Sequence, residues 1–316
     1  MSTGTLPPTA SAARPSTGSH EARRRRPRAR AGVANHESAA STATRYAILT
    51  VVSAILLAPL VFMVSIALSS DQTSREMTFT FWPTEWQFNN VVRAFTSELP
   101  IGTFLLNSLT IVVFACLGMV FSSAFVAYGF ARLRAPGKSL LFLVLLSTMM
   151  IPGEVLLIPQ FILFRNLGWV DTLLPIIVPN FFANAYNVFL MRQFISRIPT
   201  ELSEAAMIDG LGHFGIFGRI VLPLMKPILV AVAIFTFTFN WGYFFGPLIY
   251  INSEEKMPLA LGIQILSATS SGAQTPPWNM VMVGALILII PMVAIYHFGQ
   301  RYLYESGLVS GSAGLK

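Results

Sequence analysis

Few residues in this sequence could carry out chemistry on a bound molecule. The single cysteine, Cys116, lies inside an apolar run, which excludes an intrachain disulfide and a cysteine-based metal site. The histidines are too scattered along the chain to suggest a ligand cluster; they are His20, His36, His213 and His297. These residue types predict neither an enzyme nor a chain that binds a metal or cofactor.

One short segment imitates a nucleotide-binding motif. Residues 136–139 read Pro-Gly-Lys-Ser and contain the Gly-Lys-Ser that ends a phosphate-binding loop. That loop also requires an earlier glycine, which would fall at position 132, and a preceding strand. Position 132 holds an arginine, and no strand pattern precedes it. We therefore expect no ATPase activity in this chain itself.

Three amides in one apolar run have a spacing that suits binding. Asn180, Asn184 and Asn187 follow at i, i+4 and i+7, which places them on one face of a helix. An amide both donates and accepts hydrogen bonds, so these side chains suit sugar hydroxyls. Amides in membrane helices also hydrogen-bond to neighbouring helices. The three residues are candidates for lining a solute path, with helix packing as the alternative.

A second group of candidates lies in the segment 239–244, which reads Phe-Asn-Trp-Gly-Tyr-Phe. The aromatic faces of Trp241 and Tyr243 beside the Asn240 amide form a plausible device for binding a sugar ring. Packing in the protein core is the alternative for all three residues.

Glu154 is the only acid within a long apolar run, and the Pro-Gly pair before it is expected to break the helix. A charge at the centre of a membrane costs about 2.5–3.5 kcal/mol on insertion scales. Glu154 is therefore expected to have a specific role. An ordered structural partner and a gate or solute contact are the two possibilities.

The elements that position these residues are expected to span a membrane. The chain has 316 residues, of which 54% are hydrophobic and 11% charged, and soluble domains usually carry about twice that charge. So much apolar surface cannot be hidden in one aqueous core, and helical membrane spans of about 20 apolar residues would bury it in lipid instead. Six runs qualify: Tyr46–Leu68, Phe104–Ala131, Ser139–Phe164, Thr172–Met191, Ile228–Tyr250 and Asn279–Gly299. We predict an all-α integral membrane protein whose six-helix domain covers residues 46–302.

The distribution of basic residues predicts the orientation of these spans. The loops on one side contain Arg75, Arg93, Arg165 and Lys256, and the other 17 of the 21 Lys and Arg lie on the side of the two termini. The positive-inside rule then places both termini and the loop 192–227 in the cytoplasm.

The first 45 residues are expected to form a disordered basic tail. Its arginine cluster at 23–30 should be attracted to membrane lipid. Specific phosphoinositide or nucleic-acid binding is the alternative, and we expect no nucleic-acid partner.

The loop 192–227 is predicted to contain two short helices. Thr200 is a plausible N-cap, Glu201 and Glu204 lie in the first turn, and Gly210 can supply a left-handed C-terminal cap. A second amphipathic helix is predicted from the spacing of four residues: Phe214, Phe217, Gly218 and Val221. Together these helices would form a rigid projection that fits a cleft in a partner, with a helix on the membrane surface as the alternative.

The segment 204–210, Glu-Ala-Ala-Met-Ile-Asp-Gly, followed by Phe217 and Leu222-Pro223, resembles the EAA motif of ABC-importer permeases. The likeness extends from about residue 46 to 316, and further stretches are similar to the carbohydrate-uptake branch, especially the smaller permease subunit of maltose-type importers. These stretches are Asn107-Ser108, Tyr128-Gly129-Phe130-Ala131-Arg132, Pro136-Gly137-Lys138, Ile151-Pro152, Ile158-Pro159 and Gln300-Arg301-Tyr302.

The resemblance implies a type I ABC-importer permease fold in a bacterial cytoplasmic membrane. It implies import, by alternating access, of a di- or oligosaccharide or a related polyol or glycerol phosphate. The implied partners are a cytoplasmic ATP-binding subunit dimer, which holds ATP and Mg, a second homologous permease and an extracytoplasmic solute-binding protein. The residues implied to couple the chain to the ATPase are Glu204, Ala205, Ala206, Asp209, Gly210 and Phe217. The tail 303–316 would reach the ATPase dimer through Gly307, Leu308 and Gly311.

Two other functions remain open. An ABC permease for another solute class, such as peptides, would share the coupling loop. A secondary transporter would instead need internal inverted repeats, and its uptake would respond to ionophores rather than to ATP depletion.

Overall fold

The computed structural model describes residues 39–76, 82–83, 85–96, 100–268 and 276–305. In these ranges the chain consists of helices joined by turns, with no strand. Four helices are long and apolar enough to cross a membrane, and six are if each of two bent helix pairs counts as one span. The predicted all-α fold is confirmed.

The helices differ widely in length, and their order along the chain shows no regular repeat. The α-helices are α1 (Ala39–Ala67), α2 (Asp71–Glu76), α3 (Asn89–Thr96), α4 (Ile101–Arg132), α5 (Lys138–Ser147), α6 (Leu157–Asn166), α7 (Leu174–Ile177), α8 (Ala185–Ile195), α9 (Glu201–Ile208), α10 (His213–Ile216), α11 (Leu222–Leu224), α12 (Lys226–Trp241), α13 (Phe245–Tyr250), α14 (Leu259–Ala268) and α15 (Trp278–Glu305). Four 3₁₀ turns, η1 (Thr148–Met150), η2 (Gly153–Leu156), η3 (Val178–Phe182) and η5 (Glu254–Lys256), and one π-helical segment, η4 (Phe217–Val221), lie between them.

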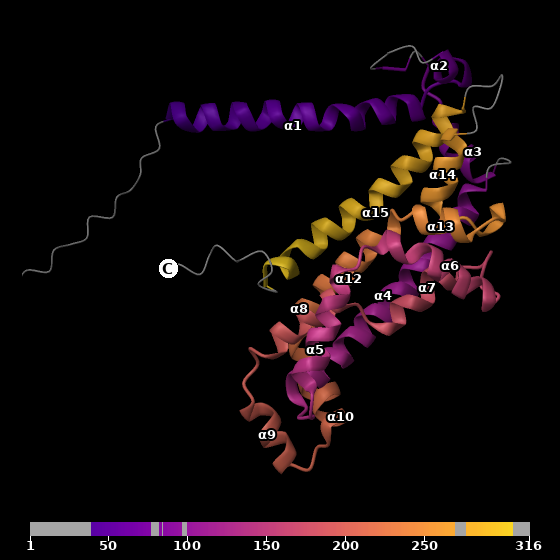
Figure 1. Cartoon of the computed structure of the whole chain (residues 1–316). Coiled ribbons are helices and arrows are strands. Elements are labelled where there is room, and N and C mark those ends of the chain that lie inside the picture. Colours follow the sequence, from indigo (N-terminus) through magenta and orange to yellow (C-terminus); the bar gives the residue numbers. More distant parts are fainter. Residues whose placement is uncertain (1–38, 77–81, 84, 97–99, 269–275, 306–316) are drawn as a thin grey trace, which may run out of the picture. The chain divides into compact units, whose positions relative to one another are not determined.

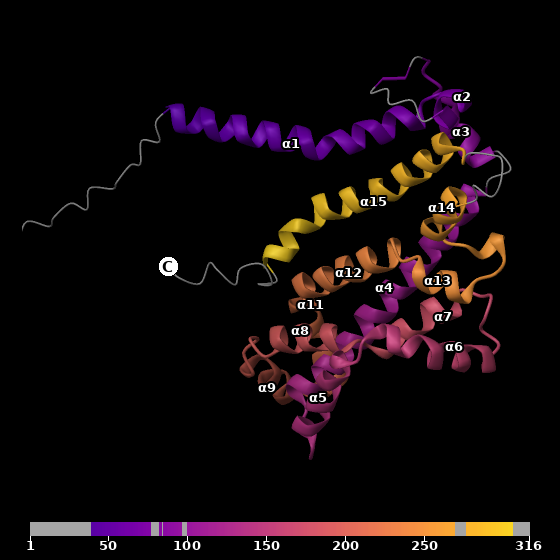
Figure 2. The ribbon, with the colours of Figure 1, turned by 45° about the horizontal axis from the view of Figure 1, so that its top comes forward.

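The long helix α4 is the element on which several other helices pack (Figure 1). It contacts α8, η3, α12 and α14, and α12 packs in turn on α15 (Figure 2). Phe104, in its first turn, belongs to the same buried cluster as Leu259 of α14. Tyr128, in its last turns, belongs to a different cluster, with Ile216 and Val221. One helix therefore joins α14 to the segment around α10.

Helix α1 contains the first predicted span. The helix begins at Ala39, so the predicted disorder is wrong for residues 39–44, where three alanines favour helix. Its most apolar 18-residue window has a mean hydropathy of 2.7. Such a surface requires lipid or another apolar partner. The arginine cluster at 23–30 lies outside the described residues.

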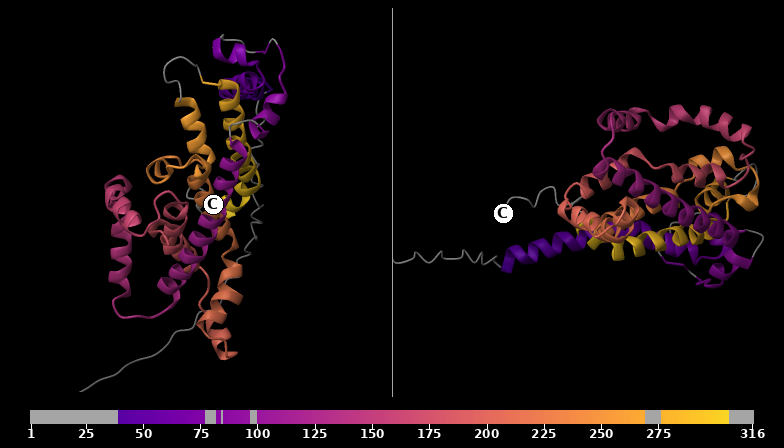
Figure 3. Two further views of the ribbon diagram at one scale, coloured as in Figure 1. Left: turned by 90° about the vertical axis from the view of Figure 1, so that its right-hand side faces the viewer. Right: turned by 90° about the horizontal axis from the view of Figure 1, so that it is seen from below.

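The third predicted span, Ser139–Phe164, is broken beside Glu154, as the Pro152-Gly153 pair predicted. Helix α5 with η1 and η2 with α6 meet at an angle of 92°, and the right-hand view of Figure 3 shows one of the two helices nearly end-on while the other lies across the picture. Ile151, the residue before Pro152, is extended, with φ −85° and ψ 117°. A proline excludes its predecessor from the helical region, which accounts for the break.

The fourth predicted span is confirmed as one candidate span, Leu174–Ile195, although its helix is interrupted, and the fifth predicted span ends early. Between Thr172 and Met191 the helix breaks at Ala183, which has φ +59° and is followed by the extended residue Asn184. The fifth span was predicted to reach Tyr250, but α12 ends at Trp241 and a separate helix α13 follows. Apolar content alone does not distinguish one long helix from two short ones, which explains the wrong end of the fifth span.

Candidate functional site

Helix α9 contains the Glu-Ala-Ala segment and ends in a hydrogen-bonded glycine cap. Gly210 has φ +84°, and its N–H donates to the Met207 carbonyl at 3.0 Å. The Leu211 N–H donates to the Ala206 carbonyl at 2.9 Å. These two bonds form a Schellman motif, which needs a left-handed residue and therefore favours glycine. Gly210 acts as predicted, whereas Thr200 occupies the N-cap without a side-chain hydrogen bond.

One face of α9 packs on the rest of the protein, and the other face is exposed. Ala206 and Ser203 are buried, and Ala206 belongs to the cluster that contains Tyr128. Four of the predicted coupling residues are exposed on the other face: Glu204, Ala205, Asp209 and Gly210. Ile208, at 87%, is among the most exposed large apolar side chains of the described chain. The helix thus presents acidic, small and apolar groups outward.

The second helix of the loop differs from the prediction. It is the continuous run α10, η4 and α11, which contains a π-helical segment, Phe217–Val221. Because a π turn adds a residue, the buried positions are Ile216, Val221 and Met225, while Phe214 is 78% exposed. Phe214 nevertheless stacks on Phe125 at 6.0 Å, the ring that Phe217 also contacts, so these two residues share a face as predicted. Gly218 is exposed, and the predicted face is wrong there.

Two residues of α4 hold the flanks of α9. The Arg132 guanidinium donates to the backbone carbonyls of Ile195 and Ile198, which precede α9. The Tyr128 hydroxyl donates to the His213 carbonyl, which follows α9, at 3.2 Å. Residues i and i+4 share one face of a helix, so both side chains reach the loop together. From the sequence these two residues were only part of a family likeness, and their structural role was not predicted.

A cavity of about 600 Å³ lies further along α4, beside Met119. Its walls come from α4, from the break before α6, from α7–α8 and from α12–α13. The lining residues are Met119, Gly153, Gln160, Pro175, Ile176, Pro179, Asn180, Ala183, Asn184, Tyr186, Asn187, Phe235, Thr236, Phe239, Asn240, Tyr243 and Tyr250. Five of the seven residues predicted to line a solute path lie here: Asn180, Asn184, Asn187, Asn240 and Tyr243.

The three amides of the fourth span reach this cavity without sharing a helical face. Asn180 lies in η3 and donates to the Ile176 carbonyl at 2.8 Å. Asn184 caps α8, and its Oδ1 accepts from the Tyr186 N–H at 2.9 Å. Asn187 lies in α8 itself. The predicted single face is wrong because the chain turns at Ala183, although the cavity still collects all three.

Trp241 and Glu154, the other two candidates, do not line the cavity. Trp241 is buried, stacks on Phe237, and donates from Nε1 to the Leu288 carbonyl of α15 at 2.9 Å. It therefore joins α12 to α15. Glu154 is exposed in η2, directly after the lining residue Gly153. Thr236 and Tyr250 also line the cavity but were not predicted from the sequence. Thr236 lies four residues before Asn240 on the same helix, α12.

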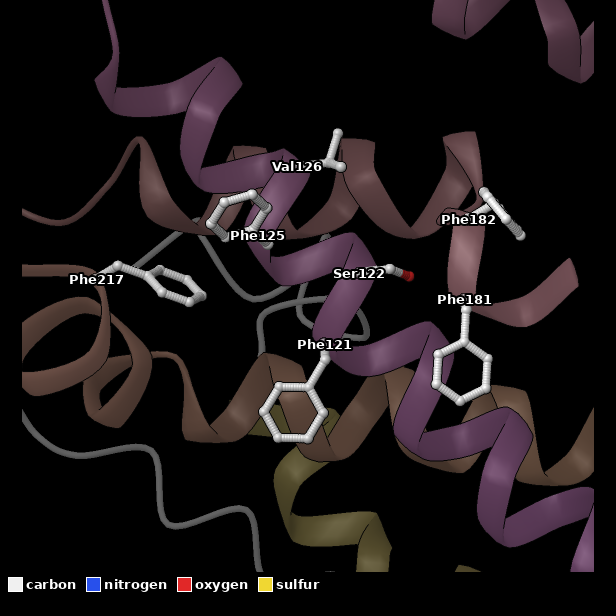
Figure 4. A pocket seen from close by; sticks show the side chains of 7 residues that line it. All are labelled: Phe121, Ser122, Phe125, Val126, Phe181, Phe182 and Phe217. Atoms are coloured by element: carbon white, nitrogen blue, oxygen red, sulfur yellow. The ribbon is translucent and has the colours of Figure 1, made fainter. Parts of the chain in front are cut away.

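Phe217, in the loop 192–227, lines an apolar groove of about 590 Å³. Its ring packs on Tyr128 and Phe125, at centroid distances of 5.1 and 5.9 Å. The groove is lined by Phe121, Ser122, Phe125, Val126, Phe181, Phe182 and Phe217 (Figure 4). This coupling candidate therefore faces α4 rather than the outer surface of α9. The predicted contacts Gly307, Leu308 and Gly311 lie outside the described residues.

Residues 118–306 match a family model described as the inner membrane component of binding-protein-dependent transport systems. The chain belongs to this family. The permease is 33% identical over 258 residues to the arabinooligosaccharides transport system permease protein AraQ of Halalkalibacterium halodurans, covering 80% of this permease and 90% of the relative. It is 36% identical over 214 residues to the sn-glycerol-3-phosphate transport system permease protein UgpE of Yersinia enterocolitica, covering 67% and 74%.

Solved structures show the same fold. A bacterial ABC transporter involved in the import of the acidic polysaccharide alginate superimposes with a TM-score of 0.72 at 23% identity, covering 83% of this permease and 95% of that chain. A second, a bacterial alginate ABC transporter in complex with an alginate pentasaccharide-bound periplasmic protein, gives a TM-score of 0.60 at 16% identity. The permease is thus a membrane transport subunit of the ABC-importer type rather than an enzyme.

Proposed function

We propose that this permease forms half of the membrane pathway of an ATP-driven importer for a sugar or a related polyol or glycerol phosphate. The named relatives support this solute class, since they serve arabinooligosaccharides and sn-glycerol 3-phosphate. The bias of Lys and Arg supports a cytoplasmic position for both termini and for the loop 192–227 in a bacterial cytoplasmic membrane. The partition into a basic tail at 1–45, a permease domain at 46–302 and a C-terminal tail at 303–316 belongs to the same proposal.

One structural relationship carries the proposal. Helix α9 is exposed on one face, while Tyr128 and Arg132 attach both of its flanks to α4. The same helix α4 contributes Met119 to the wall of the cavity. A displacement of α9 would therefore move a wall of the cavity, as alternating access requires. Such coupling needs an element with two arrangements that both sites favour differently.

The partners follow from this arrangement. A cytoplasmic dimer of ATP-binding subunits would take the outer face of α9 and hold ATP and Mg. A second, homologous permease would complete the pathway, and an extracytoplasmic binding protein would deliver the solute. Lipid would surround α1 and the other apolar helices.

The test is co-purification of the tagged chain from its native membrane. We expect an ATP-binding subunit and a second permease to be recovered with it. The Ala205→Trp variant should lose the ATP-binding subunit, because a large ring on the exposed face of α9 would keep that partner away. Ala135→Trp is the matched control, since Ala135 is exposed in the 133–137 loop on the same predicted side of the membrane. Recovery of an unchanged complex with Ala205→Trp would refute docking at α9.

A further inference from the structure

Helix α3 carries an apolar stripe that faces away from the rest of the protein. Phe88, directly before the helix, and Val91, Val92 and Phe95 within it follow at i, i+3, i+4 and i+7, so they share one face. These four side chains are between 45% and 66% exposed. A helix in a water-soluble protein normally buries such a stripe in its core. The stripe of α3 therefore needs an apolar environment that the described part of the chain does not supply.

The opposite face of α3 is fixed to the protein, so the helix cannot turn to hide the stripe. The Asn90 side-chain amide donates to the carbonyls of Ala67 and Ser69 at 3.0 and 2.9 Å. Ala94 is buried in the cluster that also contains Ala67 and Met280 of α15. Rotation of α3 would break both hydrogen bonds and expose Ala94. The outward direction of the stripe is thus built into the fold.

The contacts of α3 place it at the level where two membrane spans end. Ala67 is the last residue of α1, the first span, and Asn279 lies at the beginning of α15, the last span. The Asn279 side-chain amide donates to the Asp71 carboxylate at 2.6 Å, and the Arg93 guanidinium of α3 donates to the same carboxylate at 3.0 Å. Asp71 therefore links α3 to α15, while Asn90 links it to α1. A helix attached to the ends of two spans lies where the acyl chains of the bilayer meet the headgroups.

Stacked aromatic rings extend the stripe beyond the helix. The Trp86 ring stacks on Phe88 with centroids 5.8 Å apart, and Trp82 packs on Trp86 at a centroid distance of 5.8 Å. Both indoles are exposed. Tryptophan is enriched at the membrane–water interface, because its ring is apolar while its N–H can reach headgroups and water. The composition of this surface is therefore typical of an interfacial segment rather than of a solvated loop.

Lipid fits the stripe better than a protein partner does. All four side chains of the stripe are hydrocarbon, with neither a charge nor a hydrogen-bonding group, whereas protein interfaces contain about one hydrogen bond per 100–200 Å². The exposed apolar surface of α1 also reaches its last two turns through Val61 and Val64, close in the chain to the Ala67 carbonyl that Asn90 binds. The stripe therefore adjoins a surface that itself requires lipid.

We propose that α3, together with Trp82 and Trp86, is an interfacial anchor whose stripe inserts into phospholipid at the boundary between headgroups and acyl chains. An amphipathic helix with tryptophan and phenylalanine on its apolar face binds membranes in this way. In the proposed orientation the anchor lies in the extracytoplasmic leaflet, because α3 belongs to a loop on the side opposite the two termini. It fixes the depth of the adjoining ends of α1 and α15. The inference goes beyond the proposed function, which assigns roles to the spans and to the loop 192–227.

The experiment measures what surrounds the stripe in the intact complex in phospholipid nanodiscs. Nitroxide spin labels are attached to single cysteines introduced by Val92→Cys and Phe95→Cys, in a Cys116→Ala background. Power-saturation EPR compares the access of oxygen, which concentrates in lipid, with the access of a water-soluble nickel chelate. We expect a higher ratio of oxygen access to nickel access at both positions than at the control Asn89→Cys, which is exposed on the same helix but off the stripe.

Two other results would each overturn the inference. Nickel access at Val92 and Phe95 as high as at Asn89 would place the stripe in water. Low access of both reagents at these two positions would show that a protein partner covers it. The Cys116→Ala complex, treated in the same way, gives the background signal of cysteines in the partner subunits, and basal ATP hydrolysis verifies that every complex is folded.

A second measurement needs no variant. A phosphatidylcholine with a diazirine near the glycerol end of its acyl chain is added to the wild-type complex, and mass spectrometry locates the labelled residues after irradiation. We expect labels within residues 86–95 as well as on α1. Labelling of α1 without labelling of 86–95 would contradict the anchor. A chain that recovers no ATP-binding subunit would instead refute the proposed function.

Discussion

The Asp171 carboxylate accepts a hydrogen bond from the Lys256 ammonium at 2.8 Å, which joins the turn before α7 to η5. The same carboxylate accepts from the Ser253 hydroxyl at 2.6 Å and from two backbone N–H groups, those of Asn252 and Ser253. Asp171 itself has φ +60°, a backbone region that residues other than glycine rarely adopt. Asp171 therefore links the turn before α7 to the segment that follows α13, and both helices line the cavity.

The Asp171 network predicts how stability depends on pH. Lys256 first, and then Ser253 and the two N–H groups, hold the pKa of Asp171 well below its usual range. A lowered pKa in the folded state means that this stabilisation is complete above the ordinary carboxyl pKa near 4 and is lost as pH falls below it. Asp171→Asn should lower the thermal unfolding midpoint at pH 7.5, and the difference from wild type should shrink progressively below pH 4.

The measurement is a thermal melt of the detergent-solubilised protein across this pH range. Asp209→Asn is the control, because Asp209 is exposed and its side chain makes no hydrogen bond or ion pair in the described structure. A difference between wild type and Asp171→Asn that stays constant from pH 7.5 to 3 would contradict the assignment.

Gly210 is predicted to be required for coupling rather than for membrane insertion. Proline fixes φ near −65° and has no N–H, so Gly210→Pro removes both the φ of +84° and the bond to the Met207 carbonyl. We expect normal amounts of the variant in the membrane, with uptake separated from ATP hydrolysis.

Gly212→Pro is the matched control, because Gly212 has φ −75°, which proline accepts. Uptake and ATPase activity of reconstituted vesicles measure both variants. Tight coupling in Gly210→Pro would show that the Schellman cap is not part of the mechanism.

Arg132 and Tyr128 are predicted to transmit movement from α9 to α4. Arg132→Met keeps the apolar stem but removes the donors to the Ile195 and Ile198 carbonyls, and Tyr128→Phe removes the bond to His213. One neutral hydrogen bond contributes about 0.5–1.5 kcal/mol, and one to a charged group about 1.5–3 kcal/mol. The number of solute molecules moved per ATP should therefore fall more in Arg132→Met than in Tyr128→Phe.

Arg134→Met serves as the control, since Arg134 is exposed just after α4 and has no hydrogen bond in the described structure. The ratio is measured in proteoliposomes from uptake and phosphate release on the same sample. If Arg132→Met kept the wild-type ratio, the flanks of α9 would be coupled to the spans by another route.

Replacing Gly262 and replacing Gly129 by alanine are expected to change the stability of the protein in opposite directions. A Cβ on Gly262 of α14 would overlap the ring of Phe104, whereas one on Gly129 of α4 meets no atom within 4 Å. Gly262→Ala should destabilise by about 1–3 kcal/mol through overpacking. Gly129→Ala should stabilise by up to about 1 kcal/mol, because alanine favours helix. Thermal melts in detergent measure both, and a stabilised Gly262→Ala would show that α14 does not pack closely on α4.

The sequence was sufficient for those features that depend on residues near one another in the chain. The apolar runs predicted α1, α4 and α15 to within a few residues, apart from the start of α1 and the end of α15, because burial in a membrane is decided by composition over about 20 residues. Gly210 was predicted to cap α9, since a left-handed position selects glycine locally. The Glu-Ala-Ala segment was sufficient to indicate the family that the family match then confirmed.

Only the tertiary structure decided which side chains share a surface. The bend of 92° between α5 and α6 and the turn at Ala183 bring Gln160 and the three asparagines to one cavity, which a helical period cannot predict. The bond from Trp241 to Leu288 assigned that indole to packing, while Thr236 and Tyr250 remained unpaired in the cavity wall. Whether a polar group is satisfied depends on atoms supplied by segments far away in sequence. That information exists only once the helices are packed.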